Sequence, residues 1–585
     1  MKTGRHRDDT PTRTTEHREG EDDVDEPAEA ATLLDWLTEP SEDRGIHFAG
    51  PGSTWHFHSY AQLAAATRRM ALRLREEGAG PGDAVLVVHR NSPEFVTAFF
   101  GSLLIGATPV PMAPLSSYRD PGDLRARLAQ ARAATGARLV VGTPETLGDL
   151  GEPTGATGCA VLGHPATDAP GLDGPPASGR DAFVQFSSGS TGSPRGVRVP
   201  HRAVEANLRA FMRWLKIRVP RDGMATWLPV HHDMGLVGGL LAPVSVRTNV
   251  WMMQPEQFIR DPARWVRCFG EHGATVGVTP NFGLAHVLRR VRAGDLADLD
   301  LSGCRALVVG AERVDERVLD SWQRLFGPVG FPARAMVPAY GMAEATLAVT
   351  GSDPDEDVLT VRVAAGSLTP GKPVTIASGP GKATAVVGCG RPVPGVRLRI
   401  VDEAGDPLPS GVLGEIEIGG EAVADGYLTL DDGRPARTDF GGVFRTGDAG
   451  FLHEGQLFVL GRLGDAVKSL GKWLLAEDVE DVAARAAGTS TRPVVLLGTW
   501  EGRSTAVVLL SRDTAPHAET VGREITGTFA DLDVLAVEVR PAEIRRTTSG
   551  KPRRRHIWAS LVTPDLAARA SWDSRAAAAR PDGTG

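Results

Sequence analysis

The sequence has few cysteines and no long apolar run, and each shortage excludes a class of protein. Four cysteines are spread over 585 residues without the close pairs of a zinc site or a disulfide framework. No apolar stretch reaches the ~18–20 residues that span a bilayer. No apolar segment follows Arg5 and Arg7 to form a secretory signal. We therefore expect a cytoplasmic protein without a membrane span.

The charge balance excludes another group of partners. Lysine and arginine together number 64 and aspartate and glutamate 72, which gives a net charge of −8. Basic and acidic residues alternate along most of the chain, as on a solvated surface. Nothing in this balance favours binding to nucleic acid or to an anionic membrane. Hydrophobic residues at 41% and charged residues at 23% are typical of a soluble globular protein.

The length predicts more than one domain, because a single core rarely grows to 585 residues. Residues 1–30 are polar and end in an acidic stretch, so they are predicted to be a disordered tail. The Ala/Arg/Gly-rich residues 573–585 are predicted to be a second disordered tail. Between these tails we expect an N-terminal domain over residues 31–462 and a C-terminal domain over residues 463–572.

The N-terminal half alternates between helical and buried-strand patterns. Residues 59–77 have helical spacing, with Ser59 as N-cap, and residues 93–104 predict a second helix. Short apolar runs predict buried strands at residues 84–88, 107–111 and 139–141. This alternation predicts an α/β fold, with a large N-terminal domain built from stacked α/β sheets.

After about residue 355 the pattern changes to shorter strands with Gly-rich and Asp-rich turns. Residues 397–401 and 414–418 predict strands of a β-barrel-like subdomain. The block from about residue 464 contains its own predicted strands, at residues 493–497, 505–510 and 534–539. It is predicted to be a small, mobile α+β C-terminal domain.

A glycine- and hydroxyl-rich segment points to phosphate binding. In residues 183–197, FVQFSSGSTGSPRGV, an apolar strand leads directly into a run of Ser, Gly and Thr. Glycines let the backbone turn and expose its N–H groups, and hydroxyls add donors, so the segment can hold a phosphate chain. It is not the P-loop pattern. The alternative is a Ser/Gly surface linker, which its position between two apolar segments disfavours.

This segment resembles the phosphate loop of the adenylate-forming superfamily, which includes acyl-CoA synthetases, nonribosomal adenylation domains and fatty acyl-AMP ligases. Further segments resemble the other motifs of that superfamily in the same order, with wording most similar to the fatty acyl-AMP ligase branch. They are WLPVHHDMGLVGG at 227–239, PAYGMAEATLAVT at 338–350, RTGDAG at 445–450, GRLGDAVKSLGKWLLAEDVE at 461–480 and RTTSGKPR at 546–553.

The resemblance implies that ATP and Mg²⁺ bind here and assigns residues to them. Asp448 would accept hydrogen bonds from the ribose, and Tyr340 would offer its ring to the adenine. Glu344 would bind Mg²⁺ as a hard oxygen ligand, together with Thr191. The remaining nucleotide-binding residues would be Ser187, Ser188, Gly189, Ser190, Thr191, Gly192, Arg195, Gly310, Ala311, Glu312, Gly341, Met342 and Arg462.

The same resemblance names the catalytic residues. Adenylation brings a carboxylate against the α-phosphate, and a cation must offset the repulsion between these two anions. Lys551 would supply it, with His232 as a donor near the reacting carboxylate and Glu344 through the metal. Taken singly, each residue has an ordinary alternative. Lys551 is then a surface cation, Asp448 a turn former, Tyr340 and His232 core residues, and Glu344 a solvated helical residue.

The resemblance implies an ATP-dependent acyl-AMP ligase, and three interpretations of its function remain open. The branch wording favours a fatty or other lipophilic acid, with Met234, Leu236, Val237 and residues 279–285 as a candidate acyl tunnel. The extra segment between residues 353 and 394 disfavours free coenzyme A, so the acyl group would pass to the phosphopantetheine thiol of a separate carrier protein. The alternatives are an acyl-CoA synthetase or amide-forming ligase, and a catalytically silent scaffold.

Four departures from the family pattern stand out. Arg195 replaces a lysine of the phosphate loop, and His231 replaces an aromatic residue. Gly464 stands at the predicted hinge, near residues 462–464, where the family has Asp or Lys. Gly471, Lys472 and Trp473 replace a Gly-Arg-Asn type sequence. The last two departures concern domain rotation and transfer, and they leave adenylation untouched.

Overall fold

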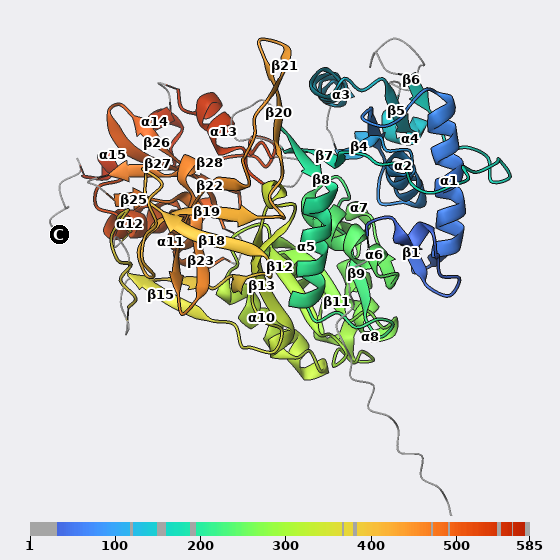
Figure 1. The fold of residues 1–585 in the computed structure, drawn as a ribbon. Helices are drawn as coiled ribbons and strands as arrows, with labels where there is room; N and C mark the ends of the chain where they lie inside the picture. Colours follow the sequence, from blue (N-terminus) through green and yellow to red (C-terminus); the bar gives the residue numbers. More distant parts are fainter. Residues whose placement is uncertain are drawn as a thin grey trace, which may run out of the picture.

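The structure, a computed structural model, describes residues 32–117, 121–148, 160–187, 195–364, 368–377, 383–469, 472–489, 492–546, 551–563 and 566–578. It confirms the predicted α/β architecture of a large N-terminal part and a smaller C-terminal domain (Figure 1). No helix in these described ranges is both long and apolar enough to cross a membrane. Residues 1–30, predicted to be a tail, lie outside them.

The first sheet is parallel and has the strand order β4-β3-β5-β6. Its strands are β3 (Ala84–Val88), β4 (Thr108–Met112), β5 (Leu139–Gly142) and β6 (Ala160–Leu162), with helices α1 (Tyr60–Glu76), α2 (Pro93–Leu104), α3 (Pro121–Thr135) and α4 (Pro144–Leu147). The predicted cap is confirmed. The Ser59 side chain accepts the Gln62 N–H and the Gln62 side chain accepts the Ser59 N–H, which forms a capping box.

The second sheet has nine strands in the order β17-β14-β13-β12-β11-β9-β10-β1-β2, and the six from β13 to β1 are parallel. Its strands are β1 (Gly45–Ala49), β2 (Trp55–Ser59), β9 (Gly223–Thr226), β10 (Asn249–Met252), β11 (Val276–Pro280), β12 (Ala306–Gly310), β13 (Met336–Gly341), β14 (Ala348–Gly351) and β17 (Arg391–Pro392). The helices around it are α5 (His201–Trp214), the π-helix η4 (Met234–Leu241), α6 (Ala242–Ser245), α7 (Pro255–Arg260), α8 (Pro262–Glu271), α9 (Asn281–Arg290) and α10 (Glu316–Phe326).

Two antiparallel sheets form the β-rich middle of the protein. One joins β7 (Asp181–Ser187) and β8 (Arg195–Pro200) to β20 (Gly426–Asp431) and β21 (Arg434–Arg437). The other contains β18 (Val396–Val401), β19 (Gly414–Gly420), β22 (Val443–His453) and β23 (Gln456–Arg462). A separate pair, β15 (Thr360–Ala364) and β16 (Ala383–Val387), lies within the extra segment predicted from the sequence.

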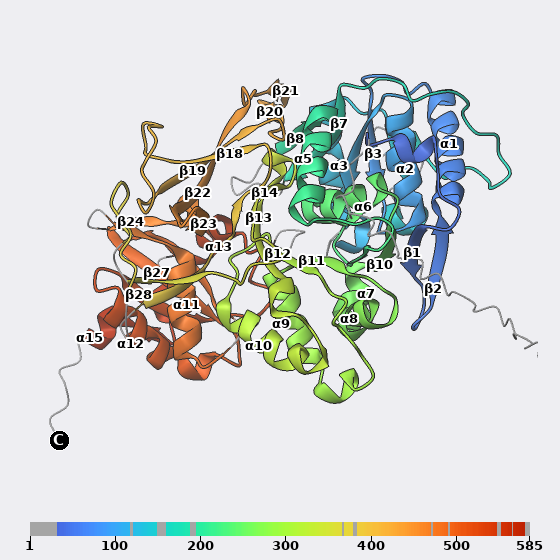
Figure 2. The same ribbon diagram turned by 60° about the horizontal axis from the view of Figure 1, so that its bottom comes forward.

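The C-terminal domain has its own cores on both faces of a mixed sheet, β26-β27-β28-β29. It comprises β24 (Val467–Ser469), β25 (Lys472–Leu474), α11 (Ala476–Ala486), β26 (Val494–Trp500), β27 (Arg503–Leu510), α12 (Ala518–Thr528), β28 (Asp533–Glu538), α13 (Arg554–Leu561), α14 (Leu566–Arg569), β29 (Trp572–Asp573) and α15 (Ser574–Ala578). Figure 2 shows the domain beside the sheet of β18, β19, β22 and β23, on the side away from α1.

The prediction that the chain is disordered from residue 573 is wrong for the described residues 573–578. Ser574 accepts the backbone N–H of Val534 through its hydroxyl, and Arg575 pairs with Glu501 at 2.7 Å. The Arg575 guanidinium also stacks over the Trp500 ring. The Ala-rich composition hid these contacts because they are made by one serine and one arginine.

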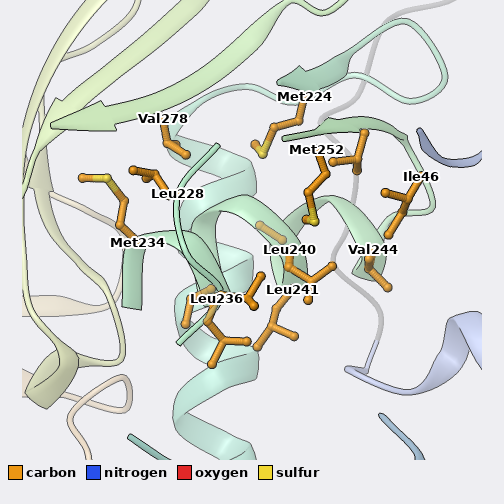
Figure 3. Packing of buried hydrophobic residues seen from close by; sticks show 14 of the residues in the cluster. Ile46, Met224, Leu228, Met234, Leu236, Leu240, Leu241, Val244, Met252 and Val278 are labelled. Carbon is orange, nitrogen blue, oxygen red and sulfur yellow. The ribbon is translucent and has the colours of Figure 1, made fainter. Parts of the chain in front are cut away.

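Figure 3 shows how η4 enters the main core of the nine-stranded sheet. Leu236 and Leu240 lie among the same buried side chains as Met224 and Met252. Leu236 and Val237 are fully buried there, as ordinary core residues. Met234 lies at the edge, and its methyl group would lie 3.5 Å from a Cβ added at Gly310. Met234 is thus a candidate tunnel residue that lies beside Gly310 of the predicted nucleotide site.

Candidate active site

The predicted site residues of the nine-stranded sheet lie where its parallel strands end. Gly310 ends β12, Gly341 ends β13, and the segment with His232 follows β9. Ligands bind at this edge in open α/β sheets because the chain leaves each strand there in a loop. The fold therefore brings together segments that are far apart in the sequence.

The predicted ribose site is a cluster of three side chains, in which Asp448 is buried, Tyr340 is half-buried and Arg462 is exposed. The Tyr340 hydroxyl donates to Asp448 Oδ2 at 2.6 Å, and Arg462 Nε lies 2.9 Å from Asp448 Oδ1. Burial raises the pKa of the Asp448 carboxyl, and the positive charges of Arg462 and Lys551 oppose this shift. The pKa of Arg462 is raised, chiefly by Asp448. The structure thus brings together Asp448, Tyr340 and Arg462, three of the predicted nucleotide-binding residues.

The predicted adenine segment has an unusual backbone. Ala311 has φ +63°, in the left-handed region that residues with a Cβ rarely adopt. Such strain is found mostly at functional sites. A Cβ at Gly310 would lie 3.0 Å from the Ala339 carbonyl oxygen, so the two strand ends approach closely. The Glu312 carboxylate accepts the backbone N–H of Phe282 at the start of α9, and burial raises its pKa.

The magnesium candidate Glu344 lies in the short turn η8 (Ala343–Ala345), next to the buried Met342. Its carboxylate oxygen Oε1 accepts a hydrogen bond of 2.6 Å from Tyr427. The guanidinium carbon of Arg195 lies 5.3 Å from the centre of the Tyr427 ring. Sequence reasoning missed Tyr427, because its partners lie more than eighty positions away along the chain and nothing local marks it.

The strands that flank the phosphate loop are described, and most of the loop is not. Strands β7 and β8 are antiparallel, and Ser187 pairs with Arg195. The predictions for Ser188, Gly189, Ser190, Thr191 and Gly192 lie outside the described residues. Gln185, on β7, donates from its side chain to the carbonyl of His231 at 3.1 Å. This bond ties the strand before the loop to the histidine segment.

The histidine segment also contains an acidic residue that sequence reasoning missed. The rings of His231 and His232 lie 4.6 Å apart, and burial lowers the pKa of His231 well below its ordinary value. The next residue, Asp233, accepts the N–H of Met234 at 2.8 Å as N-cap of η4. Burial raises the pKa of Asp233, and the positive charge of Lys551 opposes this shift. The signal was present, since Asp233 directly follows His232.

Lys551 reaches the site from the other domain. Its charge acts on three carboxylates, those of the exposed Glu312, the half-buried Asp233 and the buried Asp448. Each belongs to a different segment of the N-terminal part. Asp233 and Glu312 follow the parallel strands β9 and β12, and Asp448 lies on β22. The ammonium of Lys551 is therefore close enough to all three carboxylates to act on their charge.

A buried ion-pair network fixes the C-terminal domain in this position. Arg313, directly after Glu312, donates to Asp478 on α11 at 2.7 Å, and both side chains are less than a tenth exposed. Arg492 pairs with Asp481 at 2.8 Å and with Asp315 at 3.3 Å. Breaking such buried pairs one partner at a time is strongly destabilising. The network joins the turn after β12 to the C-terminal domain.

Known protein families and solved structures match this chain. The profile of the AMP-binding enzyme family matches residues 38–428. The chain belongs to this family. The match confirms the resemblance found in the sequence.

Among relatives of this AMP-binding enzyme, the "Long-chain-fatty-acid--AMP ligase FadD26" of Mycobacterium tuberculosis is 30% identical over 512 residues, 81% of this chain and 86% of the relative. A solved chain from "Structural and Functional Studies of Fatty Acyl-Adenylate Ligases from E. coli and L. pneumophila" is 29% identical, with a TM-score of 0.79 over 91% of this chain and 99% of that one. A fatty acyl-adenylate ligase from L. pneumophila "in complex with acyl adenylate and pyrophosphate" has a TM-score of 0.65 at 24% identity, over 91% of this chain and 96% of that one.

The residues of this AMP-binding enzyme suit a nucleotide and one divalent cation. Asp448 is a buried acceptor, as a pair of ribose hydroxyls requires. Within the described ranges, no group of three or more His, Cys, Asp or Glu side chains is placed to hold a metal ion. Mg²⁺ is usually held by one or two carboxylates together with phosphate oxygens. Glu344 therefore fits a cation that the protein shares with a triphosphate.

The predicted hinge contacts the helix that follows Lys551. The turn η9 (Leu463–Asp465) joins β23 to the C-terminal domain. Arg555 donates to the Gly464 carbonyl at 3.0 Å, and Arg554 pairs with Asp465 at 3.3 Å. Arg554 also pairs with Glu477 and Glu480 on α11. The predicted hinge is thus held by the first residues of α13, which begins three residues after Lys551.

Glu477 gives the hinge region a pH-dependent stability. Burial raises the pKa of its carboxyl from 4.5 to about 7, with Arg554 opposing the shift. The folded protein keeps a proton that the unfolded chain releases. The contribution of Glu477 to stability is therefore fully present below about pH 4.5 and is lost as the pH rises to about 7. We expect Glu477→Gln to remove this decline, measured as the free energy of urea unfolding across this pH range.

The control for this prediction is Glu519→Gln, an exposed glutamate of α12 that pairs with Arg523 on the same helix. That variant is expected to keep the wild-type pH dependence. An unfolding free energy of Glu477→Gln that declines with pH as steeply as the wild type would contradict the assignment.

Proposed function

We propose that this chain converts a carboxylic acid and ATP into an acyl-AMP and pyrophosphate, and then transfers the acyl group to the phosphopantetheine thiol of a separate carrier protein. A carboxylate oxygen attacks the α-phosphorus, and the bond to the bridging oxygen of pyrophosphate breaks. In the second step the thiol sulfur attacks the acyl carbonyl, AMP leaves and the thiol proton passes to solvent. The names of the relatives favour a fatty acid.

The observation that carries this proposal is that the positive charge of Lys551 opposes the rise in the pKa values of Asp233, Glu312 and Asp448, which come from three separate segments of the site. An ammonium in this place can neutralise both the attacking carboxylate and the α-phosphate, and this matters most where water is excluded. Asp448, Tyr340 and Arg462 would hold the ribose and the adenine side of the nucleotide. Glu344 and the phosphate loop would hold the triphosphate, with Mg²⁺ supplying further positive charge to it.

The carrier protein, in place of free coenzyme A, is supported by the extra segment between residues 353 and 394. Trp473 is the third residue of the segment that departs from the family pattern. Its backbone N–H donates to the Leu368 carbonyl at 2.9 Å. Its indole is buried with Val361, Val363 and Val386. The extra segment is thereby packed against the start of the C-terminal domain. This contact restrains the rotation that would open the site to a small thiol.

Lys551→Ala tests the first step. We expect the rate of acyl-AMP formation to fall by at least about 100-fold, because the charge that offsets two anions is removed. Pyrophosphate release and acyl-AMP, followed by mass spectrometry with a panel of fatty acids, give the measurement. Lys216→Ala is the matched control, since Lys216 pairs with Asp353 and Asp355 outside the site. A Lys551→Ala enzyme with wild-type rates would exclude the assignment.

Trp473→Ala tests the acceptor. The wild-type enzyme is expected to retain acyl-AMP when coenzyme A is added and to discharge it onto a carrier thiol. Loss of the indole frees the C-terminal domain from the extra segment, so the yield of acyl-CoA relative to acyl-AMP should rise several-fold. Trp500→Ala, in the same domain but packed against Arg575, is the control. Rapid acyl-CoA formation by the wild type would favour an acyl-CoA synthetase instead.

A further inference from the structure

Tyr427 stands between the two charged groups of the phosphate region. It lies on β20, which pairs with β8, and Tyr427 is opposite Val197 in that ladder. Its hydroxyl bonds to Glu344 Oε1 at 2.6 Å, and the Arg195 side chain also hydrogen-bonds to it. A tyrosine hydroxyl both donates and accepts, so it can serve a carboxylate and a guanidinium at once.

The ring of Tyr427 is held on its other sides by aromatic contacts. The Phe440 ring packs edge-on at 4.9 Å and the Phe444 ring at 6.2 Å. The Tyr427 N–H donates to the Thr438 hydroxyl, and the Thr438 N–H donates to the Tyr427 carbonyl. A side chain fixed in this way loses little freedom when it makes its two polar contacts.

The backbone reinforces the same connection. The Ala424 N–H donates to the Glu344 carbonyl at 2.9 Å, and the Thr346 hydroxyl donates to the Ala422 carbonyl at 2.8 Å. The segment that leads into β20 is therefore bonded to both sides of the Glu344 turn. Glu344 is positioned by its own strand, β13, and by the strand that pairs with the exit of the phosphate loop.

We propose that Tyr427 is a positioning residue that holds Glu344 for the divalent cation and couples it to Arg195 at the phosphate loop. This rests on the proposed function, in which Glu344 faces Mg²⁺ and a triphosphate. One carboxylate oxygen of Glu344 is occupied by the phenol, and this fixes the direction in which the second oxygen can reach a metal. The planar guanidinium of Arg195 suits the face of a tyrosine ring better than a lysine ammonium does. This accounts for the arginine in this chain.

The test is ATP binding by calorimetry without any acid, so that no turnover occurs. The measured quantity is the ratio of ATP affinity with Mg²⁺ to that with EDTA. Tyr427→Phe keeps the ring and removes the hydroxyl, and we expect it to lower this ratio about ten-fold, the effect of losing one hydrogen bond to a charged group. Tyr60→Phe is the matched control, because the buried Tyr60 hydroxyl donates to the Thr248 carbonyl at 2.7 Å. It should keep the wild-type ratio.

A role through Glu344 also predicts non-additive effects. Glu344→Gln should lower the ratio by itself, and Tyr427→Phe in that background should lower it no further. If Tyr427→Phe does not fold, Arg195→Gln gives the same readout, because the phenol then loses the group that holds it from the other side.

Two results would overturn the assignment. One is an unchanged ratio in Tyr427→Phe, or in Arg195→Gln if that variant is needed. The other is an additive effect in the Glu344→Gln background. A wild-type protein that binds ATP more tightly with Mg²⁺ but forms no acyl-AMP would refute the proposed function and leave this assignment standing.

Discussion

The buried guanidinium of Arg313 requires anions around it, and this requirement sets the position of a whole domain. A charge removed from water is tolerated only when it is paired and hydrogen-bonded. Asp478 and Asp481 provide that pairing from α11, so the C-terminal domain is held against the turn that follows β12. The same turn contains Glu312, one of the carboxylates that face Lys551. The ion pairs that satisfy the buried Arg313 therefore also hold the domain that contains Lys551 against this turn.

The site itself is built around carboxylates with perturbed pKa values. Asp448, Glu312 and Asp233 each have a raised pKa because burial disfavours their charged form. Cations compensate in part, from Arg462 within the N-terminal part and from Lys551 across the domain boundary. Such perturbed groups in one place are typical of functional sites. They belong to three segments spread over more than two hundred residues of the chain, and the parallel strands bring two of them to one edge.

Local patterns predicted much of the fold. The strand at 84–88 and the helix at 93–104 have the predicted bounds, and the Ser59 cap is present, because these features depend on neighbouring residues. The α15 helix was missed because its stability comes from contacts with Val534, Glu501 and Trp500. The motifs likewise pointed to Asp448, Tyr340 and Lys551, which the fold brings near one another. Tyr427 and Arg313 could not be found this way, since their partners lie roughly eighty or more positions away.

The helix that begins just after Lys551 carries a further consequence for the timing of the two reactions. Arg554 and Arg555, on its first turn, hold the hinge at Asp465 and Gly464. A rotation at the predicted hinge would have to break these two contacts. Lys551 lies three residues before Arg554. In the proposed function, the same movement would therefore displace the lysine, and departure of the adenylating charge would accompany admission of the thiol.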